Sequence, residues 1–185
     1  MGTEEVIVDN LVSGEAFLDL FRRFEFTAYR LEVRTAYAVP DEDEGYARFL
    51  AGQDPGLDWF EPWLNLMREQ TGLGKRIERV RLIDDPPSDY LRFELWGTPH
   101  NLAAGEDIRY LDRGGADQLG LPGYDYWLFD SRLLARLQFG ERNRFLGVTL
   151  DERPAEVAQH GYWRDAAWHH AESFSRYIER TATHA

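Results

Sequence analysis

The chain has 185 residues, 43% of them hydrophobic, with no cysteine and a formal net charge of −12. This length and hydrophobic content predict one folded domain with a sizeable core, and the lack of cysteine excludes disulfides, thiolate zinc sites and cysteine nucleophiles. Because binding to a nucleic-acid backbone depends on Lys and Arg, the acidic charge argues against direct contact with nucleic acid.

No apolar run approaches the ~20 residues of a membrane span, and the acidic N-terminus lacks the basic and apolar parts of a signal peptide. We therefore expect a cytoplasmic protein that makes no membrane contact. We also expect a single domain over residues 1–185, with flexible ends at 1–12 and 179–185.

The N-terminal portion is predicted to be helical and then to enter a strand. Phe17, Leu20, Phe21 and Phe24 have the i, i+3, i+4, i+7 spacing of one helical face. Residues 27–37 alternate with period two instead, which predicts a strand with one solvated or functional face.

Further elements follow in chain order to residue 113. Apolar stripes with helix-start residues predict helices, and period-two segments predict strands. The predicted elements are helices over 39–52 and 54–74, a strand over 75–84, a helix over 87–97 and a strand over 106–113. The strand–helix–strand order of residues 75–113 has the length of a crossover between parallel strands.

The last part of the chain is predicted to hold three strands and a long C-terminal helix. The strands cover 123–130, 133–140 and 143–151 and are joined by short turns. A helical segment then covers 153–182, as one helix or as two with a break at Gly161. Together these elements predict an α/β or α+β fold, in which helices flank a mixed sheet.

Segments spread between residues 14 and 177 include "FRRFEFTAYRLEVRTAY", "RVRLIDDPPSDYLRFEL", "AGEDIRYL", "YDYWLFDSRLLARLQF" and "YWRDAAWHHA". In these segments the chain resembles an actinobacterial protein family of uncharacterised function. Members of that family are often encoded beside helix-turn-helix regulators. The resemblance therefore implies a regulatory setting, with such a regulator as the protein partner.

The second half has a strand that ends in "FD", a following strand, a strand–Asp segment and a helix that carries Trp. In this order it resembles the phospholipase-D-like fold. Active members of that fold use a His and a Lys two residues apart. This sequence has no His-x-Lys, since Leu102 and Tyr162 stand two positions after His100 and His160. The resemblance implies the fold without the phosphodiesterase machinery.

His169 and His170 are adjacent in the predicted C-terminal helix. They diverge by about 100° around the helix axis and so do not converge on one metal ion, and we expect no metal and no other cofactor. His170 falls on one stripe with Trp163 and Phe174, which predicts a packed histidine. His169 points away from that stripe, as a surface group or as a pH-sensitive or ligand contact.

Arginines occupy the polar faces of three predicted strands, and their planar side chains bind carboxylates and phosphates well. The alternative is that each arginine is paired with one of the 33 acidic residues. The predicted ligand- or partner-binding residues are Arg30, Glu32, Arg34, Arg79, Arg81, Arg109, Tyr126, Asp130 and His169.

Three functions from different classes fit the sequence, which has no phosphate-binding loop and no nucleophile elbow. The first is a non-catalytic regulatory or accessory protein that binds a partner protein or a small anionic ligand. The second is a hydrolase or transferase for a phosphorylated or carboxylated substrate, with Glu94, Asp130 or His169 as acid–base group. The third is a subunit of a homo-oligomer whose contacts are aromatic.

Overall fold

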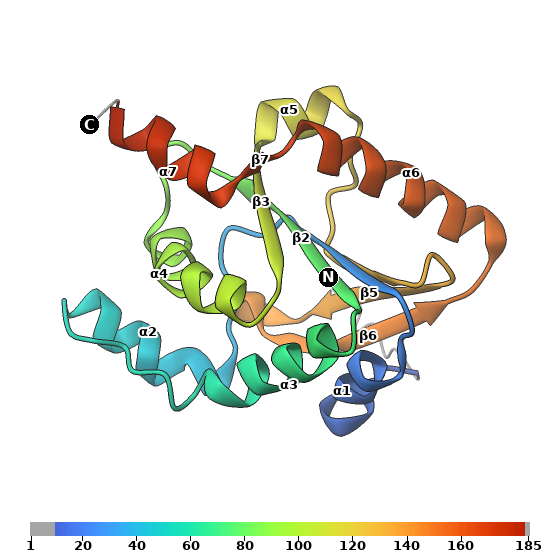
Figure 1. Ribbon diagram of the computed structural model, residues 1–185, viewed down its shortest axis with the longest axis horizontal. Coiled ribbons are helices and arrows are strands. Elements are labelled where there is room, and N and C mark those ends of the chain that lie inside the picture. Colours follow the sequence, from blue (N-terminus) through green and yellow to red (C-terminus); the bar gives the residue numbers. More distant parts are fainter. Residues whose placement is uncertain (1–9, 184–185) are drawn as a thin grey trace, which may run out of the picture.

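The structure is a computed structural model that describes residues 10–183. A seven-stranded mixed sheet passes through the middle of the molecule, with helices on both sides (Figure 1). In chain order the strands are β1 (Thr27–Glu32), β2 (Arg76–Ile83), β3 (Asp107–Asp112), β4 (Tyr126–Phe129), β5 (Leu133–Phe139), β6 (Phe145–Asp151) and β7 (Glu172–Ser173). The helices are α1 (Gly14–Arg23), η1 (Pro40–Glu42), α2 (Asp43–Leu50), α3 (Glu61–Gly72), α4 (Asp89–Ala103), α5 (Arg113–Gln118), η2 (Glu141–Asn143), α6 (Pro154–His170) and α7 (Phe174–Thr183).

The strands lie in the sheet in the order β6-β5-β4-β1-β2-β3-β7. β1, β2 and β3 are parallel, and the chain returns from β1 to β2 through α2 and α3 and from β2 to β3 through α4. β4, β5 and β6 are antiparallel to their neighbours, and β7 pairs antiparallel with β3. The predicted mixed sheet, the parallel crossover over residues 75–113 and the helical N-terminal portion are therefore confirmed.

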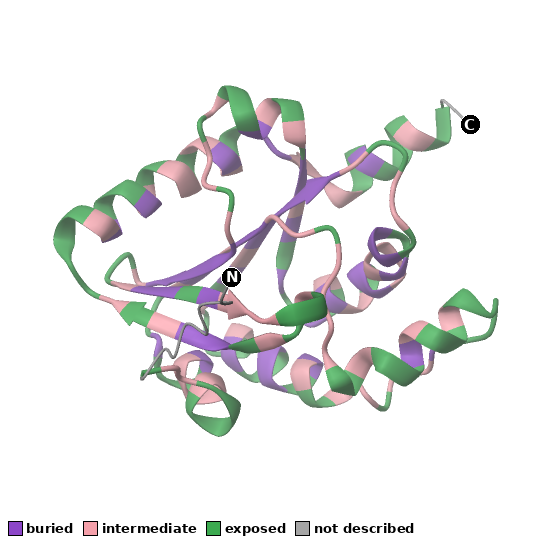
Figure 2. Cartoon of the chain, turned by 180° about the vertical axis from the view of Figure 1, so that it is seen from behind, coloured by how far each residue is buried: buried purple, intermediate pink, exposed green. Residues whose placement is uncertain are grey.

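Each face of the sheet has its own hydrophobic core, because alternate residues of a strand point to opposite faces. α1 and α3 bring Phe21 and Met67 against the face that carries Trp127. α5 and α6 cover the other face, where Leu31 and Val80 are buried. In Figure 2 the central strands are mostly buried, and the outer sides of the helices are exposed.

Helix α4 is longer than the sequence predicts. It begins after Ser88, whose Oγ accepts a hydrogen bond from the Leu91 N–H, and it continues past residue 97 to Ala103. Pro99 does not end the helix. Pro99 is exposed, and because proline has no N–H it donates no hydrogen bond to the carbonyl one turn before it.

The C-terminal break is at Ala171 and not at the predicted Gly161. Gly161 lies within α6, and Ala171 has extended backbone angles (φ −74°, ψ 143°). Glu172 and Ser173 then pair with β3 as the short strand β7. The break therefore supplies backbone partners for the outer edge of β3, a long-range effect that local sequence does not reveal.

The predicted burial of His170 is wrong. His170 ends α6 and is exposed, and Phe174 belongs to the separate helix α7. The buried histidine is His160, with 1% of its surface exposed. Its Nδ1 lies 2.7 Å from the Glu156 carbonyl oxygen, and its Nε2 lies 3.0 Å from the Tyr124 hydroxyl.

We expect His160→Ala to lower the free energy of unfolding by about 2 kcal/mol, through lost packing and lost hydrogen bonds. His170→Ala, the matched change at the exposed end of α6, is expected to cost less than about 0.5 kcal/mol. Urea unfolding followed by circular dichroism measures both values. Equal midpoints for the two variants would contradict the placement of these histidines.

The expected flexible ends fall in part on residues 1–9 and 184–185, which lie outside the described residues. Val12 and Val148 are joined by two backbone hydrogen bonds of 2.9 Å, and residues 179–183 belong to α7. Within residues 10–183, no helix combines the length and the apolar character that crossing a membrane requires.

Candidate functional site

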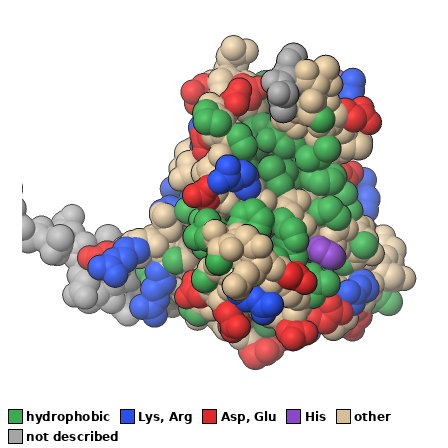
Figure 3. Space-filling view, turned by 90° about the vertical axis from the view of Figure 1, so that its left-hand side faces the viewer, with side chains coloured by type: hydrophobic (Ala, Val, Ile, Leu, Met, Phe, Trp, Pro, Cys, Tyr) green, Lys and Arg blue, Asp and Glu red, His purple; other side chains and the backbone are tan. Residues whose placement is uncertain are grey.

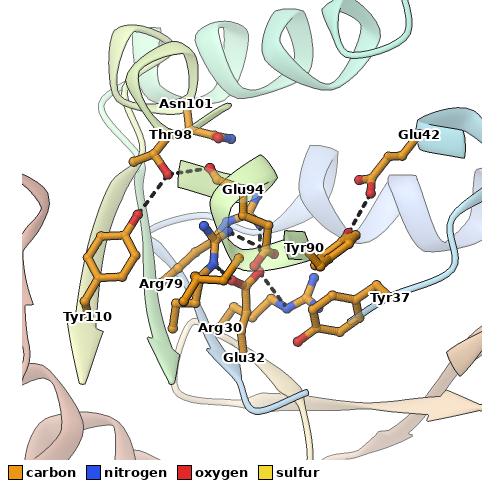
Figure 4. Close-up of polar contacts among 12 residues, drawn as sticks. Arg30, Glu32, Tyr37, Glu42, Arg79, Tyr90, Glu94, Thr98, Asn101 and Tyr110 are labelled. Atoms are coloured by element: carbon orange, nitrogen blue, oxygen red, sulfur yellow. Dashed lines mark hydrogen bonds and ion pairs between the residues drawn. The ribbon is translucent and has the colours of Figure 1, made fainter. Parts of the chain in front are cut away.

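Arginines from β1 and β2 meet on the face of the sheet that α1, α3 and α4 cover. The parallel register sets Arg30 beside Arg79 and Glu32 beside Arg81. The four side chains point to the same side of the sheet, and each of the three arginines contacts Glu32. Figure 4 shows Arg30 and Arg79 beside Glu32. We call these four residues the arginine cluster. Arg30, Arg79 and Arg81 therefore converge on Glu32, a question that the sequence left open, and the face that carries them is buried and not solvated.

Glu32 lies at the centre of the arginine cluster, with 3% of its surface exposed. Its Oε1 accepts a hydrogen bond from Arg79 Nη1 at 3.0 Å and lies 3.4 Å from Arg30 Nε. Its Oε2 accepts a hydrogen bond from Arg81 Nε at 2.5 Å. Burial opposes ionisation of this carboxyl group, but the charges of the three arginines outweigh burial and hold the pKa of Glu32 below its ordinary value.

Two further buried carboxylates complete the charge balance. Asp125 lies 3.1 Å from Arg30 Nη2 and accepts a hydrogen bond from the Tyr37 hydroxyl at 2.5 Å. Glu106 accepts a hydrogen bond from Arg79 Nε at 2.6 Å. Three guanidinium groups therefore face three buried carboxylates, and the positive charge expected to attract an anion is already paired.

A cavity of about 630 Å³ lies beside the arginine cluster, which forms part of its wall. This is the size of an ordinary small-molecule site. Aromatic side chains make up much of the remaining wall, and they include Tyr37, Trp59, Phe60, Trp63, Tyr90, Phe93 and Trp127. Apolar walls with a polar base are the usual construction of a ligand-binding pocket.

Two partly buried carboxyl groups, those of Glu42 and Glu94, also lie on the cavity wall. Glu42, from η1, accepts a hydrogen bond from the Tyr90 hydroxyl at 2.7 Å, and burial raises the pKa of Glu42. Glu94, from α4, lies 3.5 Å from Arg81 Nη2. Burial raises the pKa of Glu94 to about 8, because the attraction of Arg81 does not offset the loss of water.

Arg34 and Arg109 do not join the arginine cluster. Arg34 donates a hydrogen bond to Asn143 and lies over the ring of Phe139, 4.3 Å from its centre. Arg109 is the register partner of Val80 and so points to the opposite face of the sheet. There it lies 3.8 Å from the centre of the Trp168 ring. The expectation that Arg109 shares the arginine face is wrong, because its position in the parallel register is one residue away from Arg79 and Arg81.

Tyr126, Asp130 and His169 also lie outside the cavity lining. Tyr126 is buried on the opposite face of the sheet, where its hydroxyl donates to the His160 carbonyl oxygen. Asp130 caps the turn before β1 by accepting backbone N–H hydrogen bonds, which lower its pKa against the effect of burial. His169 is exposed. The contacts of Asp130 are those of a turn residue and not of a ligand-binding group.

Sequence reasoning missed Asp125, Glu106 and Glu42 as parts of the site. For Asp125 a signal was present. It stands two residues before Trp127, on the same face of a strand whose other residues are bulky and apolar, and a carboxylate buried there needs a positive or hydrogen-bonding partner. Glu106 and Glu42 carried no such signal, because Glu106 precedes β3 and Glu42 ends the three-residue η1, which is too short to show a period. Within residues 10–183, no group of three or more His, Asp or Glu side chains is placed to hold a metal ion.

A family model described as "Domain of unknown function (DUF6879)" matches residues 15–179. The chain belongs to this family. No curated protein matches it.

Among solved structures, the chain is similar to the crystal structure of Nuc, a phospholipase D family member from Salmonella typhimurium. The TM-score is 0.52 at 8% identity, over 85% of this chain and 87% of that chain. The chain is also similar to phosphatidylserine synthase from Haemophilus influenzae Rd KW20, with a TM-score of 0.42 at 13% identity, over 90% of this chain and 39% of that one. The likeness to Nuc concerns the fold alone, and it confirms the phospholipase-D-like architecture that the second half of the sequence indicates.

Hydrophobic side chains also gather on the surface, on the side of the molecule where α2, α4 and α7 lie (Figure 3). α2 exposes Leu50 and α7 exposes Ile178, at 54% and 41% of their surfaces. Acidic and basic side chains border the hydrophobic area (Figure 3). Assembly of this chain into a homo-oligomer stays a prediction, and this face is where contacts between copies would be sought.

Proposed function

We propose that this protein is a non-catalytic binding protein, regulatory or accessory in role, whose cavity holds a small ligand. The observation that carries the proposal is the cavity of about 630 Å³, with its aromatic walls and its base of paired buried charges. Such a base is rigid and costly to build, since buried charges must be matched closely to be stable. A rigid base beneath an aromatic cavity supports recognition of one kind of small molecule.

The cavity lining supports binding over catalysis. Among the described residues that line the cavity there is no Ser, Thr, His or Lys, which leaves carboxylates and tyrosines as its reactive groups. Glu32 is held by three arginines and is therefore a poor nucleophile. The absence of His-x-Lys from the sequence adds to this argument.

The protein partner belongs to the same proposal. A helix-turn-helix regulator, an actinobacterial setting and a cytoplasmic location are supported by the sequence resemblance and by the acidic charge of the chain. The cavity would hold the small molecule, and the exposed hydrophobic face that includes Leu50 and Ile178 would give such a partner a surface to contact.

Native mass spectrometry of protein purified from its own cells tests the proposal. We expect a non-covalent small-molecule adduct on the wild type and its loss from Gly97→Leu. Gly97 lines the cavity from α4, and a Cβ added there meets its nearest neighbour, Phe60, at 3.5 Å, so the new side chain fits and fills the cavity.

The matched control is Gly161→Leu, the same change in α6, where an added Cβ meets nothing within 4 Å. This variant is expected to keep the adduct. An adduct present in all three proteins, or in none, would overturn the proposal. Identification of the proteins that co-purify in the same preparation tests whether a helix-turn-helix regulator is the partner.

A second candidate is a hydrolase or transferase that uses Glu94 as a general acid or base. The raised pKa of Glu94, beside the lowered pKa of Glu32, is the observation that favours it, because enzymes separate carboxyl pKa values in this way. Recovery of the bound molecule in a chemically changed form after incubation with wild type, but not with Glu94→Gln, would favour this candidate over binding alone.

A further inference from the structure

The carboxyl groups around the cavity outnumber the guanidinium groups. Glu32, Glu106 and Asp125 are buried at 3% exposure or less, and they already neutralise the three arginines of the cluster. Four more carboxyl groups, those of Glu15, Asp41, Glu42 and Glu94, and one more guanidinium group, that of Arg22, also line the cavity. Arg22 is paired with Glu15 at 2.9 Å, and Asp41 is exposed to solvent. Glu42 and Glu94 are therefore the two partly buried carboxyl groups on the wall that the count leaves over. If both are ionised, the region holds two uncompensated negative charges.

Glu94 and Glu42 have few compensating contacts. The close charged neighbour of Glu94 within the described residues is Arg81, at 3.5 Å, and Arg81 is already bound to Glu32. Glu42 accepts one hydrogen bond, from the neutral Tyr90 hydroxyl. A positive group placed between the two carboxyl groups would therefore gain two ion pairs in a partly dry site, where charge interactions are strong.

Aromatic rings stand next to these carboxyl groups. The rings of Tyr37 and Tyr90 have centres 5.8 Å apart, and that of Phe93 lies 6.1 Å from Tyr90. Trp59 stacks against Phe93 at 5.5 Å. Ring faces attract ammonium groups, and ammonium sites in proteins commonly combine such rings with carboxylates.

We infer that the cavity binds a small organic cation, with its ammonium group between Glu42 and Glu94 and its apolar part against the aromatic rings. This inference rests on the proposed function and specifies the class of ligand. It replaces the anionic ligand that the sequence suggests, because Asp125, Glu106 and Glu32 balance the charge of the three arginines. Arg30 Nε and Arg81 Nη1 are buried and make no hydrogen bond among the described residues, so they are left to donate to a neutral oxygen of the ligand. The net charge of −12 acts in the same direction, since it attracts cations to the protein.

The cation takes the place of a proton. Glu94 faces Arg81 from β2, Arg30 and Glu32 from β1, and Glu42 from η1. Tyr37, Tyr90 from α4 and Tyr110 from β3 also lie near it, and burial raises the pKa of each, so they stay neutral. Burial in this environment raises the pKa of Glu94 to about 8, so the carboxyl group is mostly protonated at neutral pH. Binding of a cation requires that the proton leaves, and affinity should therefore rise with pH up to about pH 8.

Isothermal titration calorimetry with three probes of similar size tests the inference. The probes are benzyltrimethylammonium, whose charge does not change with pH, benzyl alcohol as the neutral compound, and benzoate as the anion. At pH 8.5 we expect the cation to bind at least tenfold more tightly than benzyl alcohol, and benzoate to bind more weakly still. Affinity for the cation should rise about twentyfold between pH 6.5 and 8.5, following ionisation of Glu94.

Variants separate the site from general attraction to an acidic protein. Glu94→Gln should lower affinity for the cation at least tenfold at pH 8.5 and remove most of its pH dependence. Glu78→Gln is the matched control: the Glu78 side chain is 17% exposed against 15% for Glu94, burial also raises its pKa, and it does not line the cavity. This control should bind the cation as the wild type does.

The outcomes distinguish the inference from the proposed function. If benzoate or benzyl alcohol binds more tightly than the cation, and Gly97→Leu weakens that binding, the inference that the ligand is a cation is wrong and the proposed binding function is supported. Equal cation affinity in wild type and Glu94→Gln would also overturn the inference. No binding of any probe, together with no adduct on the purified protein, would overturn both.

Discussion

Replacing Glu32 with Gln is expected to lower the free energy of unfolding by about 3–5 kcal/mol, the cost of removing one partner from a buried ion pair. The substitution keeps the shape of the side chain and removes the charge that three arginines share. Arg81 is affected most, because it loses its partner at 2.5 Å and its other acidic neighbour, Glu94, lies farther away, at 3.5 Å. Urea unfolding at pH 7 measures the change.

The pH dependence of this loss has a definite sign. The folded pKa of Glu32 lies below the unfolded value, so its contribution to stability is present above about pH 4.5 and disappears as pH falls through the folded pKa. The difference between wild type and Glu32→Gln should therefore persist from pH 5 to 8 and shrink in acid. Glu61→Gln breaks the exposed pair with Arg68, 3.0 Å apart, and as a control should cost at most about 1 kcal/mol. Similar losses for the two variants would contradict the central role of Glu32.

Replacing Glu94 with Gln is expected to do the opposite and to stabilise the protein at high pH. The folded pKa of Glu94 is about 8, above the unfolded value, so its contribution is fully present below about pH 4.5 and is lost as pH rises through 8. Glutamine resembles the protonated carboxyl group and does not ionise. At pH 8.5 we expect Glu94→Gln to be more stable than wild type by about 1–3 kcal/mol, a value that allows for the part of the shift that solvent screens.

Thermal or urea unfolding from pH 5 to pH 9 measures this effect. At pH 5 the two proteins should have nearly equal stability, because the wild-type carboxyl group is then protonated in the folded state. Parallel stability curves over the whole range would show that Glu94 has no raised pKa, and would remove the support that proton exchange gives to the cation inference.

Most of the elements could be predicted from periodicity. The stripe through Phe17, Leu20 and Phe21 became α1, and the alternation of Val80 and Leu82 with the arginines became β2 with one face in each core. The elements that escaped prediction are short or are stabilised from outside. α5, with the sequence RGGADQ, has no apolar stripe, and β7 has two residues that depend on the edge of β3.

The candidate site could be predicted only in part. Alternation assigned Arg30 and Glu32 to the same face of their strand, and Arg79 and Arg81 to the same face of theirs. It did not show that the two strands are neighbours in the sheet. The register between the strands decides which arginines meet. Arg109 pairs with Val80, the neighbour of Arg81 in β2, and therefore points to the opposite face of the sheet from Arg81. Alternation also gave no measure of burial, so the same pattern was compatible with a solvated face.

The sequence by itself determined the class of fold, the faces of the strands and the surplus of acidic charge, because periodicity and composition are properties of the chain before it folds. Only the tertiary structure decided that the arginines are neutralised and that Glu42 and Glu94 are left over beside a cavity. The charge state of a carboxyl group depends on which distant groups surround it and how much water remains, and both are fixed only when η1, α4 and the two central strands come together.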